Sequence, residues 1–425
     1  MNQRIESMKP SASMVLMARA QEMQKKDPSV IGLAGGEPDF DTPVRITEAA
    51  IRAMKEGYTH YVAGPGISEL REAICQKLRE ENGILCDTDR ILVTPGGKNA
   101  VYLAVQAVLN EGDEAIILDP SWVSYEPIVQ AAGGVAVKGK LDHRQGYRIT
   151  AEALEAACSD KTRLIIINYP NNPTGNILHG GEADILEQFL LAHPQVYLLS
   201  DEIYEKIVYG EKSISMGSRT AVADRVITVN GFSKCAAMTG WRMGYLAAPK
   251  EVFAAIIKLH QHSASCVSGF LQKGAVEALK CHQEMEEMRK VYEQRRNWFV
   301  SALNEIPGVH CEMPEGAFYA WVRFELPGKD SEQVCTFLME KAGVVGVPGY
   351  IWRRGRLLYA LFLRNSNRGL GAGREENQGG HPGGNVNKET SWACTFQLVS
   401  FCVEKSRSIL CRIAGIPWGR RRIGP

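Results

Sequence analysis

The chain lacks any long apolar run. No stretch of its 425 residues approaches the roughly 20 consecutive apolar residues that a transmembrane helix needs. The segment 1–26 carries charges throughout and has no apolar centre of the kind found in secretory signal peptides. We therefore expect a cytoplasmic protein that does not bind a membrane.

Several familiar sequence patterns are also missing. The 11 cysteines are odd in number and show no zinc-type pairing, so we expect reduced thiols, as in a cytoplasm, and no metal site. No Gly-x-Gly-x-x-Gly follows the first predicted strand, which disfavours a dinucleotide-binding fold. We find no internal repeat and no helix-turn-helix module, and we expect no nucleic-acid partner.

Short apolar runs predict the core of the fold. Most of them alternate with helical patterns, which is typical of a mostly parallel seven-stranded sheet in an α/β protein. The seven runs are Ile91–Val93, Ala115–Leu118, Val135–Val137, Leu164–Ile167, Tyr197–Leu199, Val226–Val229 and Met243–Ala247. Further along, a charged helix over 286–304 and a strand-like stretch over 316–322 predict a second, smaller α+β domain.

One lysine stands directly after a predicted buried strand. Lys234 follows the run that ends at Val229, in a turn of small residues, and Arg242 comes eight positions later. Burial favours the neutral amine, because desolvation lowers the pKa of a lysine. A neutral amine is what a carbonyl compound needs to form a Schiff base.

Polar motifs follow other strands in the same way. Asn171–Gly175 comes after one apolar run, Asp201–Tyr204 after the next, and Pro95–Asn99 after the first run. Because ligands bind at the carboxyl ends of strands in open α/β sheets, these motifs are expected to face one site. A glycine turn that opens a helix, as at Gly96-Gly97, presents free N–H groups to an anion.

In order and spacing, these motifs resemble the fold-type I pyridoxal-phosphate enzymes, specifically the class I aminotransferases of the bacterial aspartate aminotransferase type. The resemblance runs from about Met8 to about Gly349. It implies transfer of an amino group between an L-amino acid and a 2-oxo acid, with pyridoxal 5'-phosphate as cofactor, by a homodimer. Two alternatives remain open: a C–S β-lyase on the same fold, and a non-catalytic product of a damaged gene.

The resemblance also divides the chain. It implies that residues 1–44 are the N-terminal segment of the small domain and that residues 45–285 form the large cofactor-binding domain. Residues 286–350 would form a truncated small C-terminal domain, and residues 351–425 an aberrant tail.

Four residues receive catalytic and ring-binding roles from the resemblance. Lys234 would form the Schiff base with the cofactor and shuttle a proton. Asp201 would pair with the pyridine nitrogen and keep it protonated. Tyr204 and Asn172 would hydrogen-bond the phenolic oxygen of the ring.

A second group would hold the phosphate of the cofactor. Arg242 would be a bidentate clamp, with Ser233 beside it. Gly97, Lys98 and Asn99 would complete the cup at the start of a helix.

Three more residues complete the site that the resemblance implies. Trp122 would stack on the cofactor ring and, with Asn172, contact the substrate. Gly36 would contact the substrate carboxylate through its backbone. Tyr61 would reach the phosphate in the neighbouring subunit, which requires the homodimer.

The chain departs from the family after Gly349. Residues 351–425 contain 13 Lys and Arg but only 4 Asp and Glu. Such a basic tail is compatible with nucleic-acid or membrane attachment. We favour a different interpretation, a one-base frameshift near Tyr350.

Codon arithmetic supports this interpretation. Codons that encode 350–355 and 359–378, read one base later, can encode the missing family ending, which has an arginine-bearing strand, a loop and an amphipathic helix. In that reading, the arginine that clamps the substrate carboxylate comes from the codons of Ala360 and Leu361. The nucleotide sequence of the gene tests the hypothesis.

No arginine of the tail takes the place of this clamp. The candidates Arg353, Arg354, Arg356 and Arg364 do not fit the strand pattern of the family. We therefore expect weakened cofactor binding and weak activity from the chain as written. We also expect the tail after Gly349 to be mostly disordered or badly packed, with no packed core over 380–425.

Overall fold

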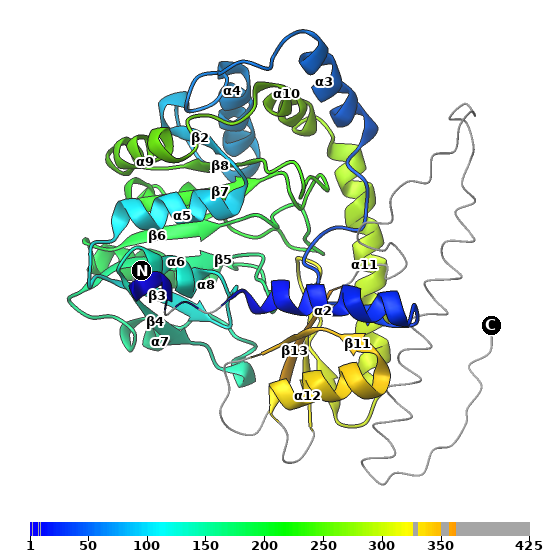
Figure 1. Ribbon diagram of the computed structural model, residues 1–425. Coiled ribbons are helices and arrows are strands. Elements are labelled where there is room, and N and C mark those ends of the chain that lie inside the picture. Colours follow the sequence, from blue (N-terminus) through cyan, green and yellow to red (C-terminus); the bar gives the residue numbers. More distant parts are fainter. Residues whose placement is uncertain (2, 7, 9, 326–329, 350–356, 363–425) are drawn as a thin grey trace, which may run out of the picture. The chain divides into compact units, whose positions relative to one another are not determined.

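The computed structural model describes residues 1–425 except 2, 7, 9, 326–329, 350–356 and 363–425 (Figure 1). Contacts divide the chain into two units. The first contains Met1–Ser11, Phe40–Glu293 and Pro314–Phe318, and the second contains Ala12–Asp39, Gln294–Met313 and the described residues from Tyr319 onward. The limits at 44, 285 and 350 that the resemblance implies stay predictions.

A seven-stranded sheet forms the centre of the first unit, which confirms the α/β fold class. Its order is β2-β8-β7-β6-β5-β3-β4, and β8 alone runs antiparallel to its neighbours. All seven predicted apolar runs lie in it. The strands are β2 (Ile91–Thr94), β3 (Glu114–Asp119), β4 (Val135–Lys140), β5 (Thr162–Asn168), β6 (Tyr197–Asp201), β7 (Val226–Gly231) and β8 (Gly244–Ala247).

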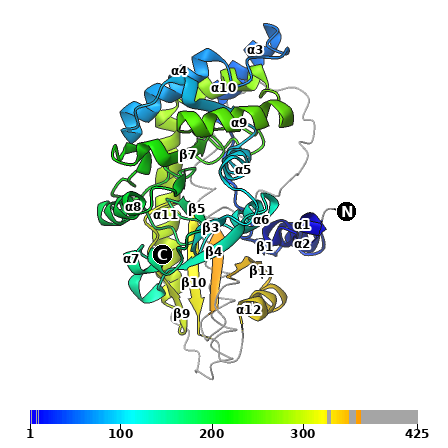
Figure 2. The same ribbon diagram turned by 90° about the vertical axis from the view of Figure 1, so that its left-hand side faces the viewer.

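Helices cover both faces of this sheet. Figure 2 shows α5 and α6 on one side of it and α8 on the other. The helices that include residues of this unit are α1 (Gln3–Glu6), α3 (Val44–Lys55), α4 (Ser68–Lys77), α5 (Gly97–Val108), α6 (Tyr125–Ala131), α7 (Ala151–Glu155), α8 (Gly180–Ala192), α9 (Lys250–Ser263), α10 (Gly269–Ala278) and α11 (His282–Asn304).

Strand alternation explains why the apolar runs are continuous. In β2, Leu92 packs in a core with side chains of α5, α6 and α9, whereas Ile91 and Val93 pack in another core with side chains of α4 and α10. Successive residues of a strand face opposite sides, so a strand covered on both faces must be apolar at every position.

The parallel arrangement brings three polar strand ends to one edge. Asn168 at the end of β5 is the register partner of Asp201 at the end of β6, and Asp201 is the partner of Val229 in β7. The motifs that follow these strands therefore start side by side.

The second unit is a small α+β arrangement. Its described elements are α2 (Ala12–Lys26), α12 (Ser331–Phe337), the parallel pair β1 (Ile31–Gly32) and β11 (Val344–Val345), and the strands β9 (Val309–Cys311), β10 (Tyr319–Phe324), β12 (Val347–Pro348) and β13 (Leu357–Phe362). The last four form an antiparallel sheet in the order β12-β13-β10-β9. Helix α11 begins in the first unit and ends here.

Strand β13 lies inside the range predicted to be an aberrant tail. Its sequence, Leu-Leu-Tyr-Ala-Leu-Phe, is rich in apolar and aromatic residues that suit a sheet, and its backbone pairs with both β10 and β12. The prediction of a mostly disordered or badly packed tail after Gly349 is therefore wrong for Leu357–Phe362, which form a paired strand. The segment 380–425, for which we predict no packed core, lies outside the described residues.

Candidate active site

Asp201 is a buried carboxylate at the end of β6. It is 5% exposed, and it accepts hydrogen bonds from Tyr125 Oη at 2.8 Å and from the Ile203 N–H at 3.3 Å. Burial raises the pKa of Asp201 to about 6, although Tyr125, Ile203 and the charge of Lys234 oppose this increase. A cation placed against this carboxylate would favour its ionised form.

The turn that carries Asn172 is fixed to the neighbouring strand end. The Asn172 N–H donates to Asn168 Oδ1 at 2.8 Å, and Asn168 Nδ2 donates to the backbone oxygen of Asp201 at 2.9 Å. Gly175 closes the turn with φ of 77°, and an added Cβ there would lie 2.5 Å from Pro314 Cβ. Only glycine fits this close approach.

Lys234 lies beside two aromatic rings. It follows β7 in the chain, and its Nζ is 6.0 Å from the ring centre of Tyr204 and 5.9 Å from that of Phe318. The two rings meet edge to face at 5.5 Å. The structure thus brings Lys234 and Tyr204 together, and Lys234 is near enough to Asp201 to lower the pKa of that carboxyl.

Arg242 lies against the glycine turn that opens α5. Its Nη1 donates to the Thr239 backbone oxygen at 2.9 Å and its Nη2 to that of Pro95 at 3.4 Å. Gly96 has φ of 84°, and an added Cβ there would lie 2.9 Å from Arg242 Cζ. Gly97 begins α5 next to this guanidinium, and Ser233 is buried at the end of the lysine turn.

Lys98 and Trp122 lie close together. Lys98 Nζ is 4.8 Å from the ring centre of Trp122, and burial together with the charge of Arg242 lowers the pKa of Lys98. Trp122 packs edge to face on Tyr125 at 5.3 Å. Asn99 Oδ1 is buried without a hydrogen-bond partner among the described residues.

Two predicted site residues are not brought to this group. Tyr61 is 91% exposed, and its predicted role depends on a neighbouring subunit. Gly36 belongs to the second unit, not to the unit that carries these groups. Their roles stay predictions.

Sequence reasoning missed two aromatic residues of this site. Tyr125 donates to Asp201, and Phe318 packs on Tyr204. Tyr125 lies within the Ser121–Tyr125 segment that carries Trp122, so its position three residues after the tryptophan could have drawn attention to it. Phe318 is distant in sequence, and no local signal connects it to Lys234.

It also missed a buried polar cluster behind the segment 201–205. Asn82 Nδ2 donates to Glu205 at 2.7 Å and to Glu202 at 3.2 Å, and Lys77 forms an ion pair with Glu205. Residues 201 and 204 carry the predicted cofactor contacts, whereas Glu202 and Glu205 fix the same segment to Asn82 and Lys77.

The assembled groups define a class of enzyme. A buried carboxylate that favours a cation, a helix N-terminus with Arg242 and Lys98 that favours an anion, and Lys234 between aromatic rings fit the pyridine nitrogen, the phosphate and the aldehyde of pyridoxal 5'-phosphate. Among the described residues, no group of three or more His, Cys, Asp and Glu could hold a metal. In the described ranges, no helix combines the length and apolar character needed to cross a bilayer.

Comparisons with known proteins give the family. The family model described as "Aminotransferase class I and II" matches residues 28–364. An aspartate aminotransferase of Musicola paradisiaca (strain Ech703) is 41% identical over 343 residues, which cover 80% of this chain and 86% of that protein. A probable aspartate/prephenate aminotransferase of Aquifex aeolicus (strain VF5) is 41% identical over 370 residues, with coverages of 84% and 93%.

Solved structures agree. The crystal structure of the aspartate aminotransferase from Rhizobium meliloti matches with a TM-score of 0.84 and 33% sequence identity, covering 96% of this chain and 98% of that chain. The fold is therefore that of the fold-type I pyridoxal-phosphate enzymes. The chain belongs to the class I and II aminotransferase family.

This membership settles the general chemistry. The protein is a pyridoxal-5'-phosphate-dependent transaminase that acts on amino acids and 2-oxo acids. The names of the relatives favour amino-group transfer over the C–S β-lyase alternative.

Proposed function

We propose that this chain transfers the amino group of aspartate to a 2-oxo acid, with Lys234 as the residue that binds the cofactor covalently and moves the proton. The substrate follows the names of the relatives, several of which are aspartate aminotransferases. The observation that carries the residue assignment is the convergence of Lys234, Tyr204 and Asp201 at the ends of β6 and β7.

The cofactor supplies an aldehyde for Schiff-base formation and a ring that accepts electrons. Asp201, when ionised, holds a proton on the pyridine nitrogen, and Tyr125 stabilises that carboxylate by donating a hydrogen bond. Asn172 and Tyr204 donate to the phenolic oxygen. Lys234 Nζ would hold the proton that leaves the substrate α-carbon during the transfer.

A second set of residues binds and orients. The N-terminus of α5, which includes Gly97 and Asn99, holds the phosphate together with Arg242 and Ser233. Lys98 adds positive charge. Trp122 would cover the ring and exclude water, and with Asn172 it would contact the substrate.

We also propose a homodimer in which Tyr61 reaches the neighbouring site. Tyr61 is almost fully exposed, and Val44, Ile51 and Met54 of α3 are exposed apolar side chains in the same unit. Exposed apolar clusters are typical of protein interfaces. Light scattering behind a sizing column should give twice the chain mass, and a monomer would contradict this proposal.

A cytoplasmic location is part of the proposal. The cysteines in the part of the chain that the structure describes are all free thiols, as expected in a reducing compartment. Fractionation of the source cells with an antibody against the chain tests the location.

The chain as written is proposed to be a weak enzyme. Ala360 and Leu361 stand in β13, where the frame-shifted reading supplies the carboxylate-binding arginine. The arginines 353, 354, 356 and 364, which do not fit the pattern, lie outside the described residues. Loss of a positioning contact alone can lower a rate about 10²-fold.

One experiment tests the function directly. Purified chain is incubated with pyridoxal 5'-phosphate, reduced with borohydride and mapped by mass spectrometry, and the label is expected on the peptide that contains Lys234. The unreduced protein is then assayed with a panel of amino donors that includes aspartate. Amino-group transfer to a 2-oxo acid supports the proposal, whereas pyruvate with free ammonia indicates the lyase. An unlabelled Lys234 contradicts the residue assignment.

A further inference from the structure

The chain between β9 and β10 contributes a short segment to the first unit. Pro314–Phe318 belongs to that unit, although the residues on both sides belong to the second. Its backbone is held on two sides. Glu315 and Gly316 donate their N–H groups to the Gly175 oxygen at 2.9 and 2.7 Å, and the Ala317 N–H donates to the Ile207 oxygen at 2.8 Å.

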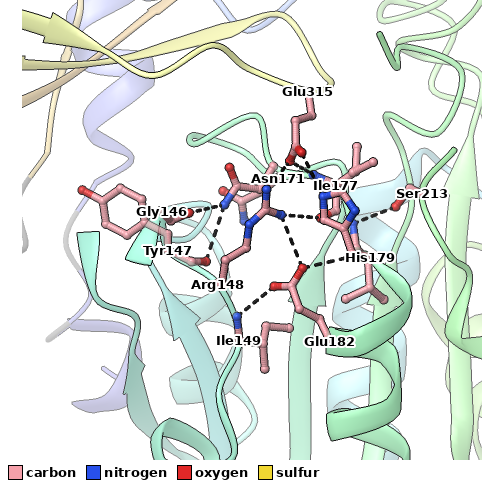
Figure 3. A network of polar contacts seen from close by, with 12 residues as sticks. Gly146, Tyr147, Arg148, Ile149, Asn171, Ile177, His179, Glu182, Ser213 and Glu315 are labelled. Carbon is pink, nitrogen blue, oxygen red and sulfur yellow. Dashed lines mark hydrogen bonds and ion pairs between the residues drawn. The ribbon is translucent and has the colours of Figure 1, made fainter. Parts of the chain in front are cut away.

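The side chain of Glu315 is the centre of a polar network (Figure 3). One oxygen accepts from Arg148 Nη2 at 2.8 Å and from the Ile177 N–H at 3.3 Å. The other lies 2.8 Å from His179 Nε2. A single carboxylate thus contacts the turn before α7 and the connection that leads into α8.

The partners of Glu315 are themselves fixed. Arg148 Nη1 donates to the Ile177 oxygen at 3.3 Å and pairs with Glu182 at 3.4 Å. Glu182 also accepts from the Ile149 N–H at 2.8 Å and from the His179 N–H at 3.4 Å (Figure 3). Each charged group of the network is thus paired, and His179 also lies 3.2 Å from Glu211 through Nδ1.

Glu315 is held ionised by this arrangement. Burial opposes its charge, but His179 and Arg148 outweigh burial and keep the pKa of Glu315 below its usual value. The three side chains are only partly buried. Partly exposed ion pairs contribute little to global stability, so a neutral substitute at 315 is expected to leave the protein folded.

Both structures that Glu315 joins carry groups of the active site. Three residues after Glu315, Phe318 packs on Tyr204 and lies 5.9 Å from Lys234 Nζ. On the other side, the Asn171–Gly175 turn carries Asn172 and continues directly to Ile177. Movement of either structure would change the surroundings of Lys234 or of Asn172.

We infer that Glu315 is a positioning residue for amino-group transfer: its carboxylate locks the Pro314–Phe318 segment to the connection that carries Asn172, and so fixes Phe318 and Asn172 about the cofactor. The inference rests on the proposed roles of Lys234 and Asn172. It assigns function to a residue that contacts neither the cofactor nor Lys234.

The first test uses hydrogen exchange of the protein without cofactor. Glu315→Gln removes the charge but keeps the size of the side chain. We expect amides of the peptides that span 171–179 and 314–318 to exchange about tenfold faster, the change that corresponds to one lost hydrogen bond to a charged group. The whole chain should stay folded, and its denaturant midpoint should decrease by no more than this one lost hydrogen bond accounts for.

Asp184→Asn is the matched control. Asp184 lies on α8, as Glu182 does, and pairs with Arg219 at 2.7 Å. Its side chain is 65% exposed, and Arg219 keeps Glu187 as a partner. This variant should leave exchange in both peptides at the wild-type rate. Equal exchange in wild type and Glu315→Gln would overturn the inference.

The second test uses the enzyme loaded with cofactor. In Glu315→Gln we expect kcat to decrease about tenfold with little change in KM. The variant would lose stabilisation of the transition state and would keep its affinity for the substrate. The pH midpoint of the visible absorbance of the bound cofactor should rise by about half a unit, since Asn172 no longer holds the ring oxygen. Arg148→Gln should give similar effects, and the double variant should not exceed the larger of the two.

The outcomes separate this inference from the proposed function. A wild-type chain that binds no cofactor at Lys234 overturns the proposed function, and the inference with it. A wild-type chain that binds the cofactor, with Glu315→Gln unchanged in kcat and in the absorbance midpoint, overturns the inference alone. The inference stands only if exchange and the properties of the loaded enzyme change together.

Discussion

The seven-stranded sheet of the first unit and the four-stranded sheet of the second differ in what their strands carry. Strands β5 and β6 end in the polar residues Asn168 and Asp201, and β7 leads into the turn of Lys234. Strand β13 is apolar or aromatic throughout, with Ala360 and Leu361 where the frame-shifted reading supplies an arginine. An apolar run is enough to form a strand, whereas chemistry needs a particular residue at a particular position. Fold can therefore persist where a site residue is lost.

The largest effect is expected from Lys234→Ala, which removes the amine proposed to bind the cofactor and to transfer the proton. We expect kcat to decrease by about 10⁴-fold, the upper range for loss of a group that transfers the proton. Borohydride should then fix no cofactor on the corresponding peptide. Lys250→Ala, at an exposed lysine of α9, is the control. Retained activity in Lys234→Ala would show that the residue after β7 is not catalytic, and would contradict the view that the first sheet carries the catalytic residues.

The second prediction concerns the second sheet. Ala360→Arg and Leu361→Arg each place an arginine in β13, and we expect one of them to raise kcat/KM about 10²-fold by restoring a positioning contact. The frame-shifted reading supplies a single arginine, so the other substitution should have no such effect. Steady-state kinetics with aspartate measures both. A chain that gains nothing from either variant would contradict the interpretation of the tail.

Tyr125→Phe should have a smaller effect at the end of β6. A hydrogen bond to a charged group contributes about 1.5–3 kcal/mol, so we expect kcat/KM to decrease roughly tenfold. Tyr125 lowers the pKa of Asp201 from the value that burial alone would give, and its loss should raise that pKa further. Activity needs the ionised carboxylate, so the acidic limb of the pH profile should move to higher pH. An unmoved limb would show that Tyr125 has no influence on Asp201.

Asp119→Asn should change stability rather than catalysis. Asp119 ends β3, and both of its carboxylate oxygens are buried without partners among the described residues. Burial raises its pKa to about 6 from 3.8. The native state thus favours the protonated acid, and stability is lost as pH rises from about 4 to about 6.

The asparagine variant should therefore be more stable by about 3 kcal/mol at pH 8, and the gain should vanish near pH 4. Urea unfolding of the cofactor-free protein at both pH values measures this. A gain of the same size at both would contradict the role of ionisation.

The sequence predicts what depends on local order. Most of the apolar runs could be recognised as strands because both faces of the sheet are covered. Lys234, Asp201 and Asn172 could be recognised because parallel strands bring consecutive motifs to one edge. Contacts between distant segments could not be predicted in this way. Glu315 meets Arg148 across 167 residues of sequence, and neither residue belongs to a recognisable motif.

The cluster behind the segment 201–205 shows the same limit. Lys77 is only 7% exposed, yet in the sequence it is one of several charged residues on an ordinary helix pattern. Its burial depends on Asn82 and Glu205, which complete its hydrogen bonds. Strand β13 is the opposite case, because its local composition does indicate a strand. We did not predict that strand, since the residues after Gly349 depart from the sequence pattern of the family.

The glycine at position 96 has an evolutionary consequence. Its missing Cβ is the space that the Arg242 guanidinium occupies, so the two positions are not free to vary separately. A larger residue at 96 would meet this guanidinium, and even beside a shorter side chain at 242 it would be strained at a φ of 84°. Variation at 242 would therefore not free position 96, and glycine is expected to persist there even in variants that have lost the arginine.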